Sequence, residues 1–421
     1  MPDRPRGRCW GIAAVTTLVL ASVSGAAIAD DLAPVPATPP EPPAAEIDPA
    51  DDEDLEIGLV PLVGGDTDHG FGAGALGTIA MFDRDHHPYR WKVEFGGFYA
   101  VKDSLTSPSF VDAYARLIYP QLLNRRLRLE VRPSFTSETV LRYYGIGNRS
   151  DRPQDDDRQR DTYERLHPSL GVTTLWQVGH DLALLFGARY TYNRIAFDPA
   201  STLAEDPIWS SHDLRAPHSV VVIEGGVVFD SRDNELAPTT GQHHMVKLRV
   251  SPRAGDVLPY GYQQINATAR VYHTIVPRYL VLAVRAVFDL QLGDVPFYEM
   301  SRYEEASAIG GGNGVRGVPS HRFYGRVKAF GNVELRSDVS RFRWRKSRYI
   351  FGVTGFYDVG RLWTDIEEAR PDLDGTGLGL HHGVGGGLRL QKGRSFLLRA
   401  DVAWSPDAQP VGVYVKANHA F

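Results

Sequence analysis

The feature of this sequence that most constrains its fold is a repeated alternation of apolar and polar residues, with charges inside the polar row. Between residues 279 and 290 every second residue is apolar, and Arg285 and Asp289 lie in the opposite row. Residues 326–336 and 395–404 alternate in the same way. Neighbouring side chains of a strand point to opposite faces, so each segment predicts a strand with one apolar and one polar face.

Two architectures produce such alternation. A soluble β-sandwich buries its apolar rows and exposes its polar rows to water. A transmembrane barrel turns its apolar rows to lipid and its polar rows to a wet lumen, which accommodates charges in the middle of many strands. Backbone groups in lipid need partners, so such a sheet has to close on itself. The mean hydropathy of −0.26 excludes a multi-span helical membrane protein, and the charged rows favour the barrel.

Segments of this kind give sixteen predicted strands. They begin near Leu55, Phe71, Arg90, Phe110, Leu127, Tyr163, Leu182, Ser219, His243, Tyr262, Tyr279, Arg322, Arg348, His382, Ser395 and Val411. Short connections such as residues 179–181 alternate with long ones such as residues 197–217. Short periplasmic turns, long outer loops and an even strand number are typical of outer-membrane barrels. We therefore predict an all-β, sixteen-stranded antiparallel transmembrane β-barrel in a Gram-negative outer membrane, with both termini in the periplasm.

The residues before the first predicted strand have a different composition. Three arginines precede a short apolar run at residues 11–23, and the small-x-small pattern of a cleavage site follows at residues 27–29. This predicts a removable signal peptide over residues 1–29; a membrane anchor is the alternative, but the run is short and contains Ser and Thr. Residues 30–54 hold seven prolines, nine acidic residues and no basic residue. We expect a disordered periplasmic tail there and the barrel over residues 55–421.

Composition and motifs also limit the chemistry. The formal net charge of −5 makes nucleic acid a poor partner. The single cysteine, Cys9, lies in the expected signal peptide, so the processed chain would have no thiol for disulfides, zinc or nucleophilic catalysis. Neither a G-x-S-x-G motif nor a phosphate-binding loop occurs. We predict no catalytic residue and no cofactor, and hence a protein that is not an enzyme.

Histidine pairs and one acidic run are the remaining candidates for a metal site. The pairs are His86-His87, His243-His244 and His381-His382. Neighbours on a strand point to opposite faces, so such a pair is a poor chelate. The acidic run at residues 155–157 lies in a predicted outer loop, where a solvated charge run is the more common reading and a divalent cation site the alternative. We predict no metal.

Several motifs together resemble the BamA/TamA superfamily of outer-membrane barrels, also called bacterial surface antigens. The segment of residues 310–317 reads Gly-Gly-Gly-Asn-Gly-Val-Arg-Gly and resembles the Val-Arg-Gly loop of that family, although Val318 stands where the family usually has an aromatic. The other matching segments, in order, are residues 144–148, 229–241, 356–360 and 383–389. The family usually carries POTRA domains before the barrel, whereas this sequence has only the Pro-rich acidic tail there. The resemblance implies a sixteen-stranded barrel, and this departure from the family predicts a barrel that lacks POTRA domains.

The resemblance also implies a site inside the barrel. In the family the loop arginine folds back into the lumen and meets acidic residues of the wall. Carried over, Arg316 meets Glu334 and Asp358, and both carboxylates also fall on the predicted inward rows of their strands. The predicted loop motif comprises Gly310, Gly311, Gly312, Val315, Arg316 and Gly317. Its glycines, together with Gly314, would allow the sharp backbone path. The alternative is a flexible surface loop with an exposed arginine.

The last predicted strand ends on an aromatic residue. Val411, Val413 and Val415 form one face of this segment, and the chain ends at Phe421. A terminal aromatic on an amphipathic last strand resembles the recognition signal of outer-membrane barrels. We therefore assign Tyr414 and Phe421 to a C-terminal barrel signal, which would be read by the cell's barrel-assembly machinery.

Three functions remain open at this stage. The first is an assembly barrel that inserts or translocates proteins, or moves lipid, through a lateral seam between the first and last strands. Gly58 and Pro61 would weaken the first strand, because glycine adds little packing and proline removes a ladder donor. The partners would be outer-membrane lipid and unfolded outer-membrane proteins. The second is a passive porin-like or structural barrel. The third is an outer-membrane phospholipase, for which no Ser/His pair stands out.

Overall fold

The computed structural model describes residues 53–66, 70–86, 88–102, 107–124, 126–150, 158–210, 212–304, 306–344, 347–393, 396–407 and 411–421. The expected signal peptide, nearly all of the expected acidic tail, His87 and the acidic run at 155–157 lie outside these residues. In the described part of the chain, no helix is long and apolar enough to cross a bilayer.

Nearly all regular structure is β. The strands are β1 (Glu53–Asp66), β2 (Gly70–Asp83), β3 (Trp91–Val101), β4 (Phe110–Leu122), β5 (Leu127–Arg142), β6 (Thr162–Leu166), β7 (Ser169–Gln177), β8 (Leu182–Phe197), β9 (His218–Asp230), β10 (Gly241–Ser251), β11 (Tyr262–Val276), β12 (Leu280–Gly293), β13 (Arg302–Tyr303), β14 (Ala306–Ser307), β15 (Val327–Trp344), β16 (Ser347–Trp363), β17 (His381–Lys392), β18 (Phe396–Trp404) and β19 (Gly412–Ala417). The short helices are α2 (Arg158–Asp161), α3 (Thr202–Glu205), η1 (Pro207–Trp209), α4 (Phe297–Met300) and α5 (Pro371–Asp374).

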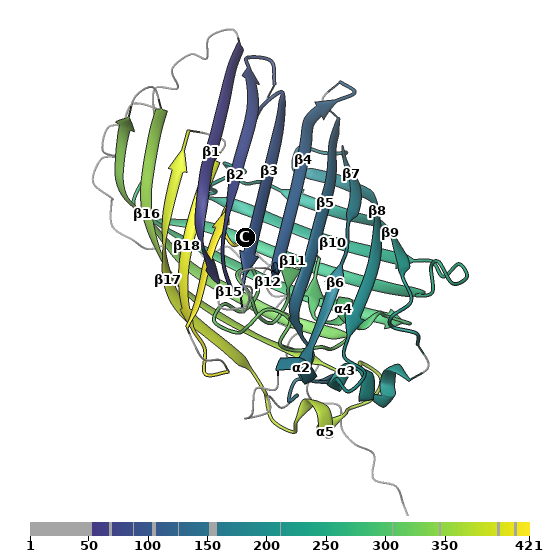
Figure 1. The fold of residues 1–421 in the computed structure, drawn as a ribbon. Coiled ribbons are helices and arrows are strands. Elements are labelled where there is room, and N and C mark those ends of the chain that lie inside the picture. The colour runs from purple at the N-terminus through teal and green to yellow at the C-terminus, as the bar shows by residue number, and fades with distance from the viewer. Residues whose placement is uncertain are drawn as a thin grey trace, which may run out of the picture. The chain divides into compact units, whose positions relative to one another are not determined.

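The long strands form one antiparallel sheet of 17 strands that curls on itself, so that β1–β5 lie in front of β10–β12 (Figure 1). The long strands pair with the next long strand along the chain, except that β6 and β7 each pair with both β5 and β8. β12 pairs with β15 across the loop that holds β13 and β14. This confirms the predicted antiparallel barrel. The strand predicted to begin near Arg322 begins instead at Val327.

The strand count of sixteen is not confirmed, because one predicted strand is interrupted. The segment expected from Tyr163 forms β6 and β7, which both lie between β5 and β8. The break falls at His167 and Pro168. Proline has no backbone N–H to donate to a ladder, so the pairing stops there and resumes at Ser169.

The alternation of side chains follows the prediction. Arg285 and Asp289 of β12 point into the lumen and are 3% and 0% exposed. On β18, Asp401 is buried inside, whereas Val402 and Trp404 lie on the outer face, each 52% exposed. The outer apolar rows therefore form the surface expected to meet lipid, and the charged rows line the interior.

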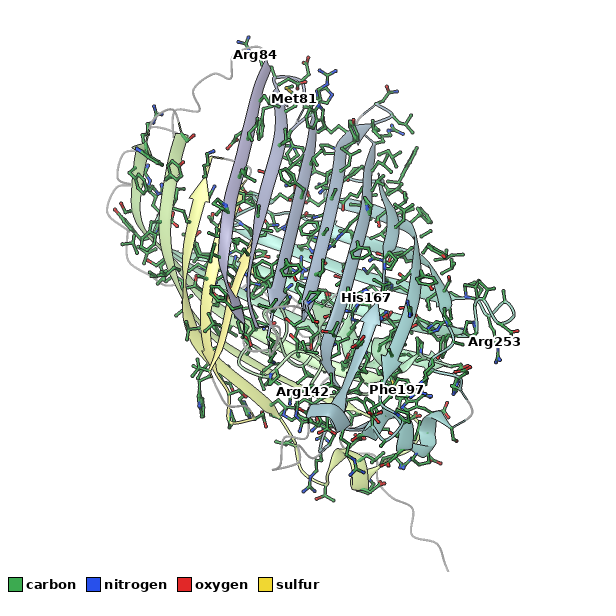
Figure 2. All side chains as sticks on the ribbon, in the orientation of Figure 1. Met81, Arg84, Arg142, His167, Phe197 and Arg253 are labelled. Carbon is green, nitrogen blue, oxygen red and sulfur yellow. The ribbon has the colours of Figure 1, made fainter. Side chains whose placement is uncertain are left out.

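The connections differ between the two ends of the sheet. Met81 and Arg84 lie at one end, and Arg142 and Phe197 lie at the other (Figure 2). We call the first the short-turn end, because it carries turns such as residues 123–126, 178–181 and 277–279. We call the second the long-loop end. There, an aromatic cluster that includes Tyr143, Trp209, Phe297 and Tyr324 packs beneath the loops.

Candidate functional site: a loop, a charge network and a strand seam

The loop between β12 and β15, residues 294–326, enters the lumen. Its tip turns sharply at Gly310, Gly311 and Gly317, whose φ angles are +130°, +68° and +93°. L-residues rarely adopt these angles, so glycine is needed for this path. Val315 and Val318 are fully buried in an apolar cluster of the lumen with Ile309 and Leu362. The loop is therefore a packed part of the interior.

Arg316 lies at the centre of this loop and is fully buried. Its guanidinium donates to Asp358 through Nε and Nη2, at 2.7 and 2.9 Å, and the Arg316 backbone N–H donates to Asp358 Oδ2 at 3.0 Å. Nη1 donates to Glu334 Oε1 at 2.6 Å. The structure thus brings together Arg316 and the two carboxylates assigned to it from the sequence, and the paired geometry on Asp358 uses the planar fork of arginine.

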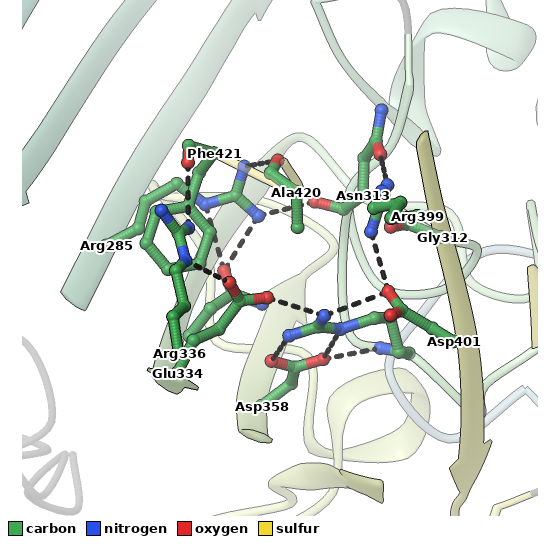
Figure 3. A network of polar contacts seen from close by, with 12 residues as sticks. Arg285, Gly312, Asn313, Glu334, Arg336, Asp358, Arg399, Asp401, Ala420 and Phe421 are labelled. Atoms are coloured by element: carbon green, nitrogen blue, oxygen red, sulfur yellow. Dashed lines mark hydrogen bonds and ion pairs between the residues drawn. The ribbon is translucent and has the colours of Figure 1, made fainter. Parts of the chain in front are cut away.

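A third carboxylate, Asp401 of β18, completes the set. Arg316 Nη1 lies 3.2 Å from Asp401 Oδ2, and the guanidinium lies 3.4 Å from the centre of the Phe356 ring. Figure 3 shows Glu334, Asp358 and Asp401 converging from three different strands. Sequence reasoning missed Asp401 as a partner. The available signal was its place in the charged row of its strand, beside Arg399.

Other arginines balance these acids. Arg336 donates to Glu334 at 2.8 Å, Arg399 donates to Asp401 at 2.8 Å, and Arg389 also pairs with Asp401. Burial by itself would lower the pKa of the Arg316 guanidinium, but the hydrogen bonds to Asp358 and the charge of Glu334 raise this pKa above its ordinary value. The arginine stays charged, and its ion pairs with the wall hold the loop in place.

The wall also holds the loop by its backbone. Arg399 Nη2 donates to the Gly312 carbonyl at 2.7 Å, and Asn332 Nδ2 donates to the Gly314 carbonyl at 2.8 Å. Tyr414 of β19 accepts a hydrogen bond from the Gly317 N–H through its hydroxyl, at 3.0 Å. Tyr414, assigned from the sequence to the C-terminal signal, is thus a lumenal residue that connects the last strand to the loop.

Phe421, the other residue of that assignment, lies beyond the end of β19. The chain turns at Asn418, where φ is +64°, and Phe421 is 9% exposed. Arg336 donates to the Phe421 carbonyl at 3.0 Å, and Arg285 donates to the Ala420 carbonyl at 3.2 Å. The guanidiniums of Arg285 and Arg336 both lie against the Phe421 ring, 4.9 and 5.1 Å from its centre, respectively. The terminal segment is therefore held on the inside of the wall (Figure 3).

The first and last strands lie next to each other, but among the described residues no β-ladder joins β1 to β19. β1 pairs with β2 along its full length of 14 residues, whereas β19 has only 6 residues and pairs with β18. We call this boundary the seam. Towards the short-turn end of the seam, Lys392 Nζ donates to the Ile57 carbonyl at 2.8 Å. This contact of a β17 side chain with the β1 backbone lies at the seam, where among the described residues no ladder closes the barrel.

The histidine pairs contact separate partners. His381 lies 3.0 Å from Asn148 and 3.1 Å from Asp407, whereas His382 contacts the Tyr357 hydroxyl. His244 contacts Gln242. Within the described ranges, no group of three or more His, Cys, Asp or Glu side chains converges on a possible metal position.

Comparisons with known proteins agree with this architecture. A model described as the Omp85 superfamily domain matches residues 101–415. The chain is similar to the crystal structure of BamA from Haemophilus ducreyi lacking POTRA domains 1–3, with a TM-score of 0.52 and 13% identity over 87% of this chain and 70% of that chain. It is also similar to CdiB from Escherichia coli, with a TM-score of 0.55 and 13% identity over 86% of this chain and 62% of that chain.

At this level of identity, the solved structures establish a common fold. The chain spans less than two thirds of the CdiB structure. A search of curated proteins finds no match. No POTRA domain is present among residues 53–421 as far as the structure describes them.

Proposed function

Because the chain belongs to the Omp85 superfamily, we propose that it inserts or translocates proteins at the outer membrane through the seam between β1 and β19. Membership in this superfamily supports an outer-membrane role in insertion or translocation in general. The observation that carries the finer proposal is the absence of a ladder between β1 and β19 in the described residues.

An unpaired strand edge is a template for another strand. Backbone N–H and C=O groups along such an edge form hydrogen bonds with an extended peptide that adds to the sheet. In lipid these groups have no water to satisfy them, so adding a strand there is more favourable than at a hydrated edge. No ladder is described along the edge of β1 that faces β19, where the Ile57 carbonyl accepts from Lys392, and a client strand would extend the sheet from this edge.

The charge network supports a coupling between the lumen and this edge. Asp401 of β18 holds Arg316, and Tyr414 of β19 holds the Gly317 N–H, so the loop is fastened to the two strands on one side of the seam. Arg285 connects the loop to the C-terminal segment, because it donates to both the Asn313 and the Ala420 carbonyls. We infer that the loop keeps β18 and β19 in place while β1 moves.

The packed lumen argues against a wide passive channel. The loop of residues 294–326 occupies the interior with Ile309, Val315 and Val318 in its apolar cluster. The proposed activity requires no catalytic residue, and its substrates would be unfolded outer-membrane proteins beside the lipid of the membrane. We propose periplasmic termini, which places the short-turn end in the periplasm.

The test is the folding of an unfolded outer-membrane barrel into liposomes that contain the purified protein. We expect faster folding than in empty liposomes, measured by the shift in gel mobility between folded and unfolded client. Liposomes with an equal mass of an unrelated porin are the control for bilayer defects. If the protein folds correctly yet gives the same client rate as the porin, the proposal is wrong and a passive barrel is the better account.

A further inference from the structure

We propose that the turn of residues 231–240, between β9 and β10, is a gate at the short-turn end of the lumen, latched to the wall of β3–β5 by Glu235. This turn is one of the segments singled out in the sequence, and it takes no part in the Arg316 network. At 10 residues it is longer than the other turns at this end.

The latch connects parts of the chain that are far apart in sequence. Glu235 Oε1 accepts a hydrogen bond from Arg128 Nη2 of β5 at 2.6 Å. Glu235 Oε2 accepts one from the hydroxyl of Tyr89, in the turn between β2 and β3, at 3.1 Å. One carboxylate therefore joins two turns and one strand. Because Arg128 lies in the inward row of β5, the tip of the turn reaches over the lumen.

Glu235 also balances the charge of an ion-paired cluster on the wall. One cluster on this wall joins three cations, Lys92, Arg116 and Arg128, to two carboxylates, Glu94 and Glu130, through ion pairs of 2.6 to 3.3 Å. Glu235 supplies a third carboxylate. Burial alone would raise the pKa of Glu235, but Arg128 and Lys92 bring it below its usual range, so the latch is ionised.

One side of the latch is fixed and the other is able to move. Tyr89 is 4% exposed and packs with Phe82 and Ile118 in a small apolar cluster on the lumen wall. The turn instead keeps its shape largely through its own hydrogen bonds, because Asp233 accepts from Thr239 and Thr240, and Asn234 accepts from the N–H of Leu236. Near its β10 end, where it would hinge, the Thr239 carbonyl accepts from the Thr274 hydroxyl of β11 at 3.0 Å. A turn braced in this way can swing as a unit once Glu235 is released.

The test measures access to the lumen with a cysteine reporter. Cys9 is the only native cysteine, so Ser134→Cys in a Cys9→Ser background places a single thiol on β5, further into the barrel than Arg128. Detergent-solubilised protein is labelled with a large polyethylene-glycol maleimide. We expect Glu235→Gln to increase the labelling rate about tenfold, because loss of the charge pair raises the population of the open turn.

Two comparisons make the result specific. Glu368→Gln, a change of the same type at an exposed loop position, should label at the wild-type rate. High salt should speed labelling of the wild type but not of Glu235→Gln, because salt weakens an ion pair that the variant no longer has. Equal labelling of Glu235→Gln and the wild type would overturn the proposal. If the variant fails to fold, the salt comparison within the wild type is the test, and an unchanged labelling rate at high salt would overturn the proposal.

Discussion

Arg316→Ala is expected to destabilise the barrel by about 3 kcal/mol, because it removes one partner from a fully buried set of ion pairs. Asp358 is the most affected carboxylate, since the hydrogen bonds described for it all come from Arg316. Glu334 keeps Arg336 as an ion-pair partner and Asp401 keeps Arg399, which limits the loss of stability. The midpoint of heat-induced unfolding, followed by gel mobility, measures the effect.

The matched control is the double variant Arg316→Ala with Asp358→Asn. Neutralising Asp358 removes the uncompensated buried charge, so the double variant should regain part of the stability lost in the single one. Arg316→Lys should fall between wild type and Arg316→Ala, because it keeps the charge and loses the paired hydrogen bonds. A wild-type unfolding midpoint for Arg316→Ala would show that the network does not hold the loop.

Gly383→Ala is expected to have an effect of similar kind, by displacing the loop. Gly383 lies on β17 directly opposite Asp358 of β16. A Cβ atom at this position would lie 1.9 Å from the Arg316 carbonyl oxygen, which is a backbone atom and cannot rotate away. We expect a loss of about 2 kcal/mol in stability and a weaker client-folding activity.

Gly355→Ala is the control for Gly383→Ala. Gly355 belongs to the neighbouring strand β16, and a Cβ there would have no atom within 4 Å. Its stability should match that of the wild type within about 0.5 kcal/mol. Equal stability of the two variants would mean that the loop does not rest on Gly383.

The fold was predictable because its pattern is local. Alternation along each strand fixes which residues face the lumen, so the inward orientation of Glu334 and Asp358 followed from their positions in the row. The interruption between β6 and β7 was missed, although Pro168 marks it, since the surrounding apolar pattern continues through the break. The alternation of apolar and polar residues does not indicate where the hydrogen-bond ladder between two strands stops.

Contacts between segments that are far apart in the sequence were harder to predict. The inward path of Phe421 depends on Arg285 and Arg336, which belong to strands on another part of the wall. Strand parity alone would have continued β19 to the end of the chain. The contact between Glu235 and Arg128 spans 107 residues and depends on how far one turn leans over the lumen. These features are set by tertiary packing.

The central claim is that the seam has to move, and a reversible disulfide across it tests this most directly. A Cβ at Gly58 of β1 would lie 3.0 Å from Phe396 Cβ of β18, which is within disulfide reach. Gly58→Cys with Phe396→Cys, in a Cys9→Ser background, would tie β1 to the other side of the seam. Val60→Cys with Leu76→Cys is the control, because these residues are partners in the β1–β2 ladder.

We predict that the oxidised seam variant no longer accelerates folding of the client barrel in liposomes, and that reduction restores the rate. The control pair should be active in both states. Full activity of the oxidised seam variant, with the disulfide verified on a non-reducing gel, would contradict the account.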